Sequence, residues 1–155
     1  MNQDRKIGFE LKTLHNLIGH YFESVRSTPP MDSITRMQGW IIGYLGKQEN
    51  QGQSVFQKDV ENQFAIRRST ATGILQLMEK NGLLIRESVE QDARLKKLVL
   101  TPKAREIHAI IIRDMQRMEQ VLSSGITDQE KQAFFAVLDK IKANLEQEAA
   151  EKPKN

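Results

Sequence analysis

Apolar residues recur at steps of three and four along the first part of the chain, which is the repeat of an amphipathic helix. This pattern predicts a long helix over residues 7–25, which ends before Pro29-Pro30 because proline removes a backbone donor. A second helix follows, with Asp32 or Ser33 as its predicted cap. Its predicted buried face consists of Ile34, Met37, Trp40, Ile41, Tyr44 and Leu45.

The middle of the chain has shorter periodic segments separated by turn residues. Ser54 and Gln57 have the spacing of a capping box, which predicts a third helix over about residues 55–63. A turn at residues 64–66 leads into a fourth helix over about residues 67–81. Two short helices joined by a tight turn are the helix-turn-helix arrangement, so we expect that motif here.

The pattern then changes from helix to strand. Gly82 suits the left-handed position that closes a helix, and residues 83–85 have the apolar, branched character of a strand. Residues 97–100 are the predicted return strand of a hairpin. The connection over residues 87–96 is long and charged, so we expect it to project from the body as a wing.

Two further helices complete the predicted elements. Thr101-Pro102 is a strong helix start, and Thr127 with Glu130 forms a second capping box. The predicted apolar stripes are Ala104, Ile107, Ile111, Met115, Met118 and Leu122 in the fifth helix, and Phe134, Leu138, Ile141 and Leu145 in the sixth. The expected fold class is mainly α with a small β-hairpin wing, built as a single domain over residues 1–155.

Composition narrows the classes of function. The chain has no cysteine, which excludes disulfides, thiolate metal sites and sensing by cysteine oxidation. It has no secretory leader pattern and no long apolar run, so we expect a cytoplasmic protein with no membrane association. The net charge of +3 is small, but the excess of basic residues is concentrated in residues 54–105.

Catalytic motifs are missing from the sequence. The histidines are His15, His20 and His108, and the first two point away from each other on a helix. No phosphate-binding glycine loop, nucleophile elbow or zinc-hydrolase motif occurs. We therefore expect no enzyme activity, no metal and no cofactor.

The fourth helix has side chains suited to reading DNA. Short outward residues allow close approach to base edges in the major groove, and Gln76 can reach an adenine. Arg67 and Arg68 suit phosphates at the helix start, Arg94 suits a narrow minor groove, and Asp92 is expected to orient Arg94 or Arg86 through a bidentate pair. The candidate DNA-binding residues are Arg67, Arg68, Ser69, Thr70, Thr72, Gly73, Gln76, Arg86, Asp92, Arg94 and Lys96.

These segments resemble a known family. The order of residues 79–86, Asp92-Ala93-Arg94 and Leu98-Val99-Leu100-Thr101-Pro102 after a helix-turn-helix is similar to the MarR (multiple antibiotic resistance regulator) family of winged-helix repressors. One departure is Ala104, where the family commonly has glycine. The resemblance implies a winged helix-turn-helix over residues 54–105, with the fourth helix in the major groove and Arg94 in the minor groove. It also implies a homodimer held by dimerisation helices in residues 1–28 and 106–150.

The resemblance further implies a small aromatic effector bound between the dimerisation region and the winged helix. Five residues either line such a crevice or belong to the core or the dimer seam: His15, Tyr21, Trp40, Tyr44 and Met115. The expected function is that of a homodimeric repressor of a pseudo-palindromic operator in double-stranded DNA, relieved by the effector. The alternative is a winged-helix protein-interaction module without DNA binding.

Overall fold

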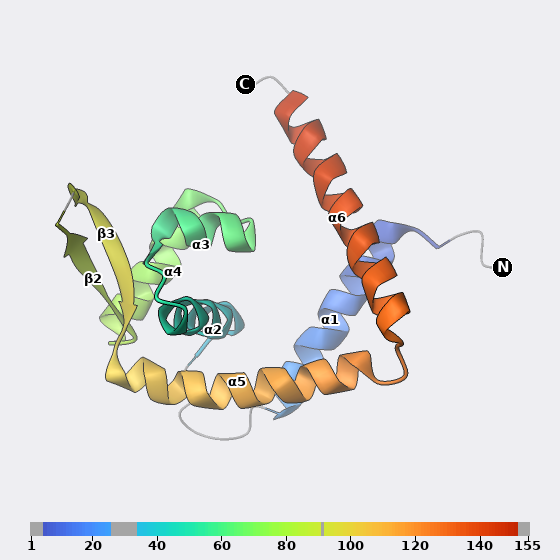
Figure 1. The fold of residues 1–155 in the computed structure, drawn as a ribbon, viewed down its shortest axis with the longest axis horizontal. Helices are drawn as coiled ribbons and strands as arrows, with labels where there is room; N and C mark the ends of the chain where they lie inside the picture. The colour runs from blue at the N-terminus through green and yellow to red at the C-terminus, as the bar shows by residue number, and fades with distance from the viewer. Residues whose placement is uncertain (1–4, 26–33, 91, 152–155) are drawn as a thin grey trace. The chain divides into compact units, whose positions relative to one another are not determined.

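A computed structural model describes residues 5–25, 34–90 and 92–151 of the chain. Its elements follow in the order α1 (Ile7–Val25), α2 (Arg36–Asn50), β1 (Val55–Phe56), α3 (Gln57–Phe64), α4 (Arg68–Lys80), β2 (Leu84–Val89), β3 (Asp92–Leu100), α5 (Pro102–Ser123) and α6 (Asp128–Glu151), as Figure 1 shows. The mainly α class with a small β wing is confirmed. The chain forms two compact units, Met1–Asp114 and Met115–Asn155.

Local signals locate most helix ends, but the predicted start of α2 needs a correction. The helix is capped by Thr35, whose hydroxyl accepts from the Gln38 amide at 3.2 Å, while the Gln38 side chain accepts from the Thr35 amide at 3.0 Å. The predicted cap at Asp32 or Ser33 is therefore wrong, and both residues lie outside the described ranges. Gln38, three residues after Thr35, supplies the reciprocal acceptor that makes this start the favourable one.

A three-stranded antiparallel sheet with the order β1-β3-β2 lies beside the helix-turn-helix. Val55 is buried and pairs with Leu98, so this segment is a strand and the predicted Ser54–Gln57 capping box is wrong. Helix α3 starts at Gln57 instead, where the Asp59 carboxylate accepts from the Phe56 amide at 2.8 Å. The partner of Val55 is distant in the sequence, and no local pattern indicates it.

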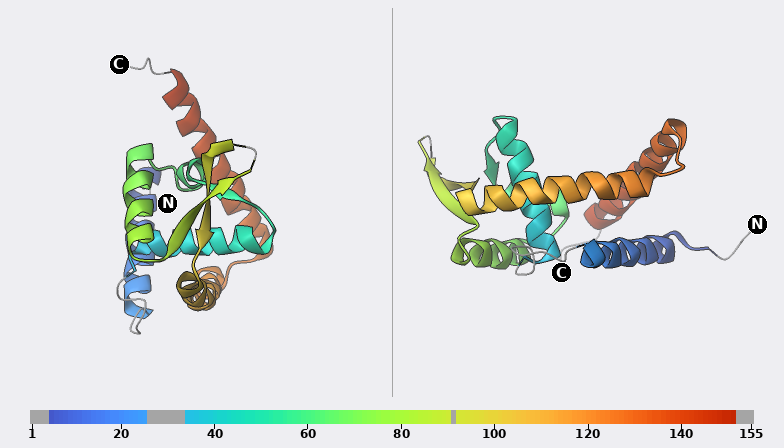
Figure 2. Two further views of the ribbon diagram at one scale, coloured as in Figure 1. Left: turned by 90° about the vertical axis from the view of Figure 1, so that its left-hand side faces the viewer. Right: turned by 90° about the horizontal axis from the view of Figure 1, so that it is seen from below.

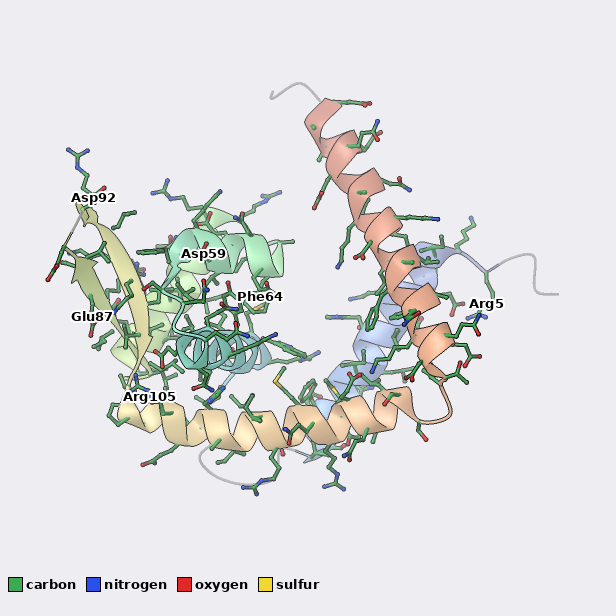
Figure 3. All side chains as sticks on the ribbon, in the orientation of Figure 1. Arg5, Asp59, Phe64, Glu87, Asp92 and Arg105 are labelled. Atoms are coloured by element: carbon green, nitrogen blue, oxygen red, sulfur yellow. The ribbon has the colours of Figure 1, made fainter. Side chains whose placement is uncertain are left out.

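The wing is a longer ladder than the sequence predicts. Strands β2 and β3 extend to Val89 and from Asp92, so the predicted loop over residues 87–96 is wrong. Glu87 lies opposite Lys97 with their charged groups 3.2 Å apart, and Figure 3 shows Asp92 at the far end of the hairpin. Opposite charges facing each other across two strands stabilise the pairing, so a charged segment need not be a loop.

The core of the first unit lies between α2, α4, the sheet and the start of α5. The residues with almost no exposed surface are Ile41, Ile42, Leu45, Leu75, Met78, Leu83, Leu84, Leu98, Leu100 and Ile107. Gly82 has φ +66° and closes α4 as predicted, since only glycine adopts that conformation without strain. Thr101 caps α5 through the Ala104 amide and also donates to the Gly82 carbonyl at 2.7 Å. These contacts hold the hairpin against both helices.

The second unit consists of the end of α5 and all of α6. The predicted capping box is confirmed, because the Thr127 amide donates to the Glu130 carboxylate at 2.9 Å and the Glu130 amide donates back to the Thr127 hydroxyl at 3.3 Å. Helix α6 buries none of its residues. Among the described residues, no helix is both long enough and apolar enough to cross a membrane.

Candidate nucleic-acid interface

Helix α4 presents an exposed face of small polar residues. Ala71, Leu75 and Met78 are buried on its inner side, as the pattern predicts. The opposite side carries exposed Arg67, Arg68, Ser69, Thr70, Gly73 and Gln76, whereas Thr72 is partly buried. A Cβ placed on Gly73 would meet nothing within 4 Å. This face can therefore approach another molecule closely.

The turn before α4 sets the angle at which that face is presented. Helix α3 ends at Phe64 and is capped by Ala65, a non-glycine residue with φ +49° whose amide donates to the Asn62 carbonyl. The cap of α4 is Arg67, whose side chain makes no capping hydrogen bond. The first amides of α4 have no side-chain acceptor, which is the arrangement that suits an incoming anion such as a phosphate.

The Gln57 side chain links α3 to α4. Its amide nitrogen donates to the Thr72 hydroxyl at 2.8 Å and to the Glu61 carboxylate at 3.2 Å, and it lies 3.5 Å from the Arg68 carbonyl. The sequence placed Gln57 in a capping box and did not predict this role. The predicted helix-turn-helix motif could have indicated this contact, because the motif brings the first residues of α3 beside α4.

The wing contributes cations to the interface, and its Asp92 makes a different contact from the predicted one. Arg94 is exposed near the end of the hairpin, and Asp92 accepts from the Arg94 backbone amide at 2.8 Å. Arg86 pairs with Glu79 of α4 at 3.2 Å. The predicted bidentate pair of Asp92 with the Arg94 or Arg86 guanidinium is therefore wrong, because a tight turn brings its carboxylate to the nearby backbone amide instead.

A groove with a volume of about 430 Å³ lies between α3, α4 and the wing. Its described lining residues are Phe56, Gln57, Lys58, Glu61, Arg68, Thr72, Arg86, Arg94, Leu95 and Lys96. The cations in this set outnumber the carboxylates, and Lys58 is one that sequence reasoning missed. Lys96 also donates to the Ser88 hydroxyl across the hairpin. The groove therefore brings together predicted residues from both the helix and the wing in a positive environment.

The five candidate effector residues lie on α1, α2 and α5, and Met115 belongs to the second unit. Trp40 stacks edge-on against Phe22, and Tyr44 stacks edge-on against Phe64. Burial, together with the nearby Asp59 carboxylate, raises the pKa of Tyr44, so its hydroxyl stays protonated and can donate. His15 is exposed and Tyr21 is partly buried on α1, and Met115 begins the second unit. The aromatic pairs favour a packing role for Trp40 and Tyr44.

Among the described residues, no cluster of three or more His, Cys, Asp or Glu side chains is arranged to hold a metal ion. The chemistry of the groove is that of hydrogen-bond donors and positive charges.

The chain is similar to known regulators. A model of the MarR family matches residues 32–95. The HTH-type transcriptional regulator YybA of Bacillus subtilis is 27% identical over 144 residues, which are 93% of this chain and 89% of that protein. The crystal structure of the transcription regulator MarR from Oenococcus oeni is 32% identical, with a TM-score of 0.77 over 89% of this chain and 99% of that one.

A structure of the Staphylococcus aureus MepR–DNA complex has the same fold. Its TM-score is 0.72 at 24% identity, over 90% of this chain and 99% of that chain. The fold is thus shared over nearly the whole chain.

Proposed function

The chain belongs to the MarR family of winged-helix transcriptional regulators, and on that premise we propose that it represses transcription by binding a pseudo-palindromic operator as a homodimer. The family is one of regulators and not of enzymes. The observation that carries the proposal is the exposed small-residue face of α4 beside a groove lined by cations. The MepR–DNA complex, which shares this fold, supports DNA as the partner.

DNA binding divides between the two parts of the interface. Ser69, Thr70, Gly73 and Gln76 on α4 are short or flexible enough to meet base edges in the major groove. Figure 2 shows the β2–β3 hairpin projecting away from α4. Arg94 of β3 is exposed, and in this proposal it enters the adjacent minor groove. Arg67, Arg68 and Lys96 supply the phosphate contacts that hold the protein on the duplex.

Homodimerisation is supported by the apolar surface of the terminal helices. Ile7, Leu11, Leu14 and Leu17 of α1 are exposed, and so are Phe134, Phe135, Val137 and Leu145 of α6. Large apolar side chains exposed on each of these helices indicate an interface, and a second copy of the same chain is its occupant in this proposal. Residues 1–28 and 106–150 then form the dimerisation region, and two α4 helices enter major grooves about 34 Å apart.

A small aromatic effector completes the proposal. The protein has one conformation that binds the operator and one that does not. By linkage, the effector relieves repression only if its affinity is higher for the conformation that does not bind the operator. His15, Tyr21, Trp40, Tyr44 and Met115 remain the candidate residues for such a site.

One observation favours the alternative of a protein-interaction module. Leu77 of α4 and Leu95 of β3 are each about half exposed, and Leu95 lines the groove. A protein partner would bury these leucines, and its affinity would depend on them and hardly on salt. DNA binding would instead weaken steeply as salt rises, because bound cations are released from the duplex.

The test is an anisotropy titration of the full chain against labelled DNA selected from a random pool, over a range of salt concentrations. We expect an enriched palindromic site and a steep salt dependence. Arg94→Ala should weaken binding and reduce the salt slope by about one, and Lys47→Ala, which removes an exposed cation of α2 outside the groove, is the control. If no site is enriched at low salt, the proposal is wrong. If Arg94→Ala has the salt slope of the wild type, Arg94 does not contact the DNA.

A further inference from the structure

Within the described part of the chain, the hydroxyl of Thr72 makes a single hydrogen bond, in which it is the acceptor. It accepts from the Gln57 side chain at 2.8 Å, and it has no acceptor for its own proton among the described residues. A hydroxyl carries one donor and two acceptor positions. Thr72 lines the groove between α4 and the wing, and it follows the exposed Ser69 and Thr70 on the same helix.

The other neighbours of Gln57 decide which end of its amide group faces α4. The Glu61 carboxylate at 3.2 Å and the Arg68 carbonyl at 3.5 Å can only accept hydrogen bonds. The nitrogen end of the amide must therefore face them, since the oxygen end would be repelled by both. The same nitrogen is the atom that lies against Thr72, so the Thr72 oxygen must be the acceptor in that pair.

This arrangement leaves the Thr72 proton to be donated outward. In an isolated helix a threonine hydroxyl often donates to the carbonyl four residues earlier, which here belongs to Arg68. The Gln57 nitrogen lies near that carbonyl and competes for it. The Thr72 hydroxyl is thus turned into a donor for whatever occupies the groove.

We propose that Gln57 is a specificity-determining positioning residue, which holds Thr72 as a hydrogen-bond donor and makes this position of α4 select a base edge with an acceptor. In the major groove the acceptors are guanine O6 and N7, adenine N7 and thymine O4, whereas the amino groups of cytosine and adenine are donors. Thr72 therefore selects against an amino group at its contact. This inference rests on the proposed DNA-binding function.

The direction of the hydrogen bond can be reversed without changing the net charge. In the double variant Gln57→Glu with Glu61→Gln, residue 57 can only accept and residue 61 supplies the amide donor. The Thr72 proton then points inward to the new carboxylate, and its oxygen presents lone pairs to the groove. The preferred base edge at this one position should change from an acceptor to an amino group.

The experiment selects bound sites from a random DNA pool with the full-length wild-type chain and four variants. Thr72→Val lacks the hydroxyl, so the base pair at which this variant loses the wild-type base preference is the one that Thr72 contacts. Thr72→Ser keeps a hydroxyl and should show the wild-type preference at that base pair. Gln57→Met keeps the side-chain length but cannot donate, so it should weaken the preference at the same base pair by about two- to tenfold, as expected for one hydrogen bond. The charge-neutral double variant should reverse the preference.

The readout separates positioning from general folding, because only one base pair should change while the rest of the site and the thermal midpoint stay the same. An enriched site whose preference is the same in Gln57→Met and in the double variant would overturn the inference and leave the proposed function intact. A Thr72→Val variant that prefers the wild-type base at every position would overturn the inference in the same way. Failure of the wild-type chain to enrich any site would overturn both.

Discussion

Many large apolar side chains are buried in the winged region over residues 54–105 but exposed on the terminal helices α1 and α6. In the winged region Leu75, Met78 and Leu98 are at most 2% exposed. On the terminal helices Ile7 is 61% exposed and Leu145 is 67% exposed. The buried apolar residues of the first region lie in a core that α2 and the start of α5 complete, whereas the terminal helices carry exposed apolar surface that a partner could cover. Recognition and assembly thus depend on different parts of the chain.

The largest expected effect is the loss of a core side chain. Leu75→Ala should lower the free energy of unfolding by about 2–5 kcal/mol, because it leaves a cavity in a site with no exposed surface. The matched control is Leu77→Ala on the same helix, where the side chain is 46% exposed and the change should stay within about 0.5 kcal/mol. Denaturant unfolding measures both. Equal losses in the two variants would mean that α4 is not packed as described.

The second effect concerns assembly and not stability. Leu14→Asp should weaken self-association at least about tenfold, because a carboxylate in an apolar contact costs more than about 1.4 kcal/mol. Asn16→Asp adds the same charge on the other side of α1 and should leave association unchanged. Sedimentation over a concentration series measures the equilibrium. If both variants associate like the wild type, α1 does not contribute to the dimer.

A third variant separates stability from recognition on α4. Gly73→Ala should raise the free energy of unfolding by about 1 kcal/mol, because alanine favours a helix and the added methyl group meets no neighbour. The same methyl group should weaken operator binding about tenfold if this face lies against base edges. Unfolding and anisotropy measurements should therefore change in opposite directions. A stabilised variant with unchanged affinity would place DNA elsewhere.

The smallest expected effect is a pH dependence at the start of α6. Hydrogen bonds from the Thr127 amide and hydroxyl lower the pKa of Glu130 below its ordinary value. The folded carboxyl is the stronger acid, so its stabilising contribution is present above the ordinary glutamate pKa and is lost as pH falls through the lowered one. The protection factors of the first α6 amides, which correct hydrogen exchange for its intrinsic pH dependence, should fall over that acidic range. Glu130→Gln should remove the pH dependence, and an identical profile in the variant would contradict this account.

Local signals predicted much of the fold correctly. The apolar stripe of α1, the Thr101-Pro102 start of α5 and the Thr127–Glu130 box all depend on residues within a few positions of each other, and each is confirmed. One error was local, because the Thr35–Gln38 capping box of α2 was overlooked. The errors at β1 and along the wing have another cause, because Val55 and Glu87 become strand residues only by pairing with β3. Strand pairing is a contact between distant residues, which helical periodicity does not describe.

The interface shows the same division. The amino-acid sequence by itself determined that α4 has an apolar inner face, a small polar outer face and basic residues at its start, because helical geometry follows from spacing alone. Only the tertiary structure decided that Arg86 pairs with Glu79, that Asp92 bonds a backbone amide, and that Gln57 faces Thr72. The direction of a hydrogen bond depends on which donors and acceptors meet in space, and the packing of α3, α4 and the wing brings those groups together.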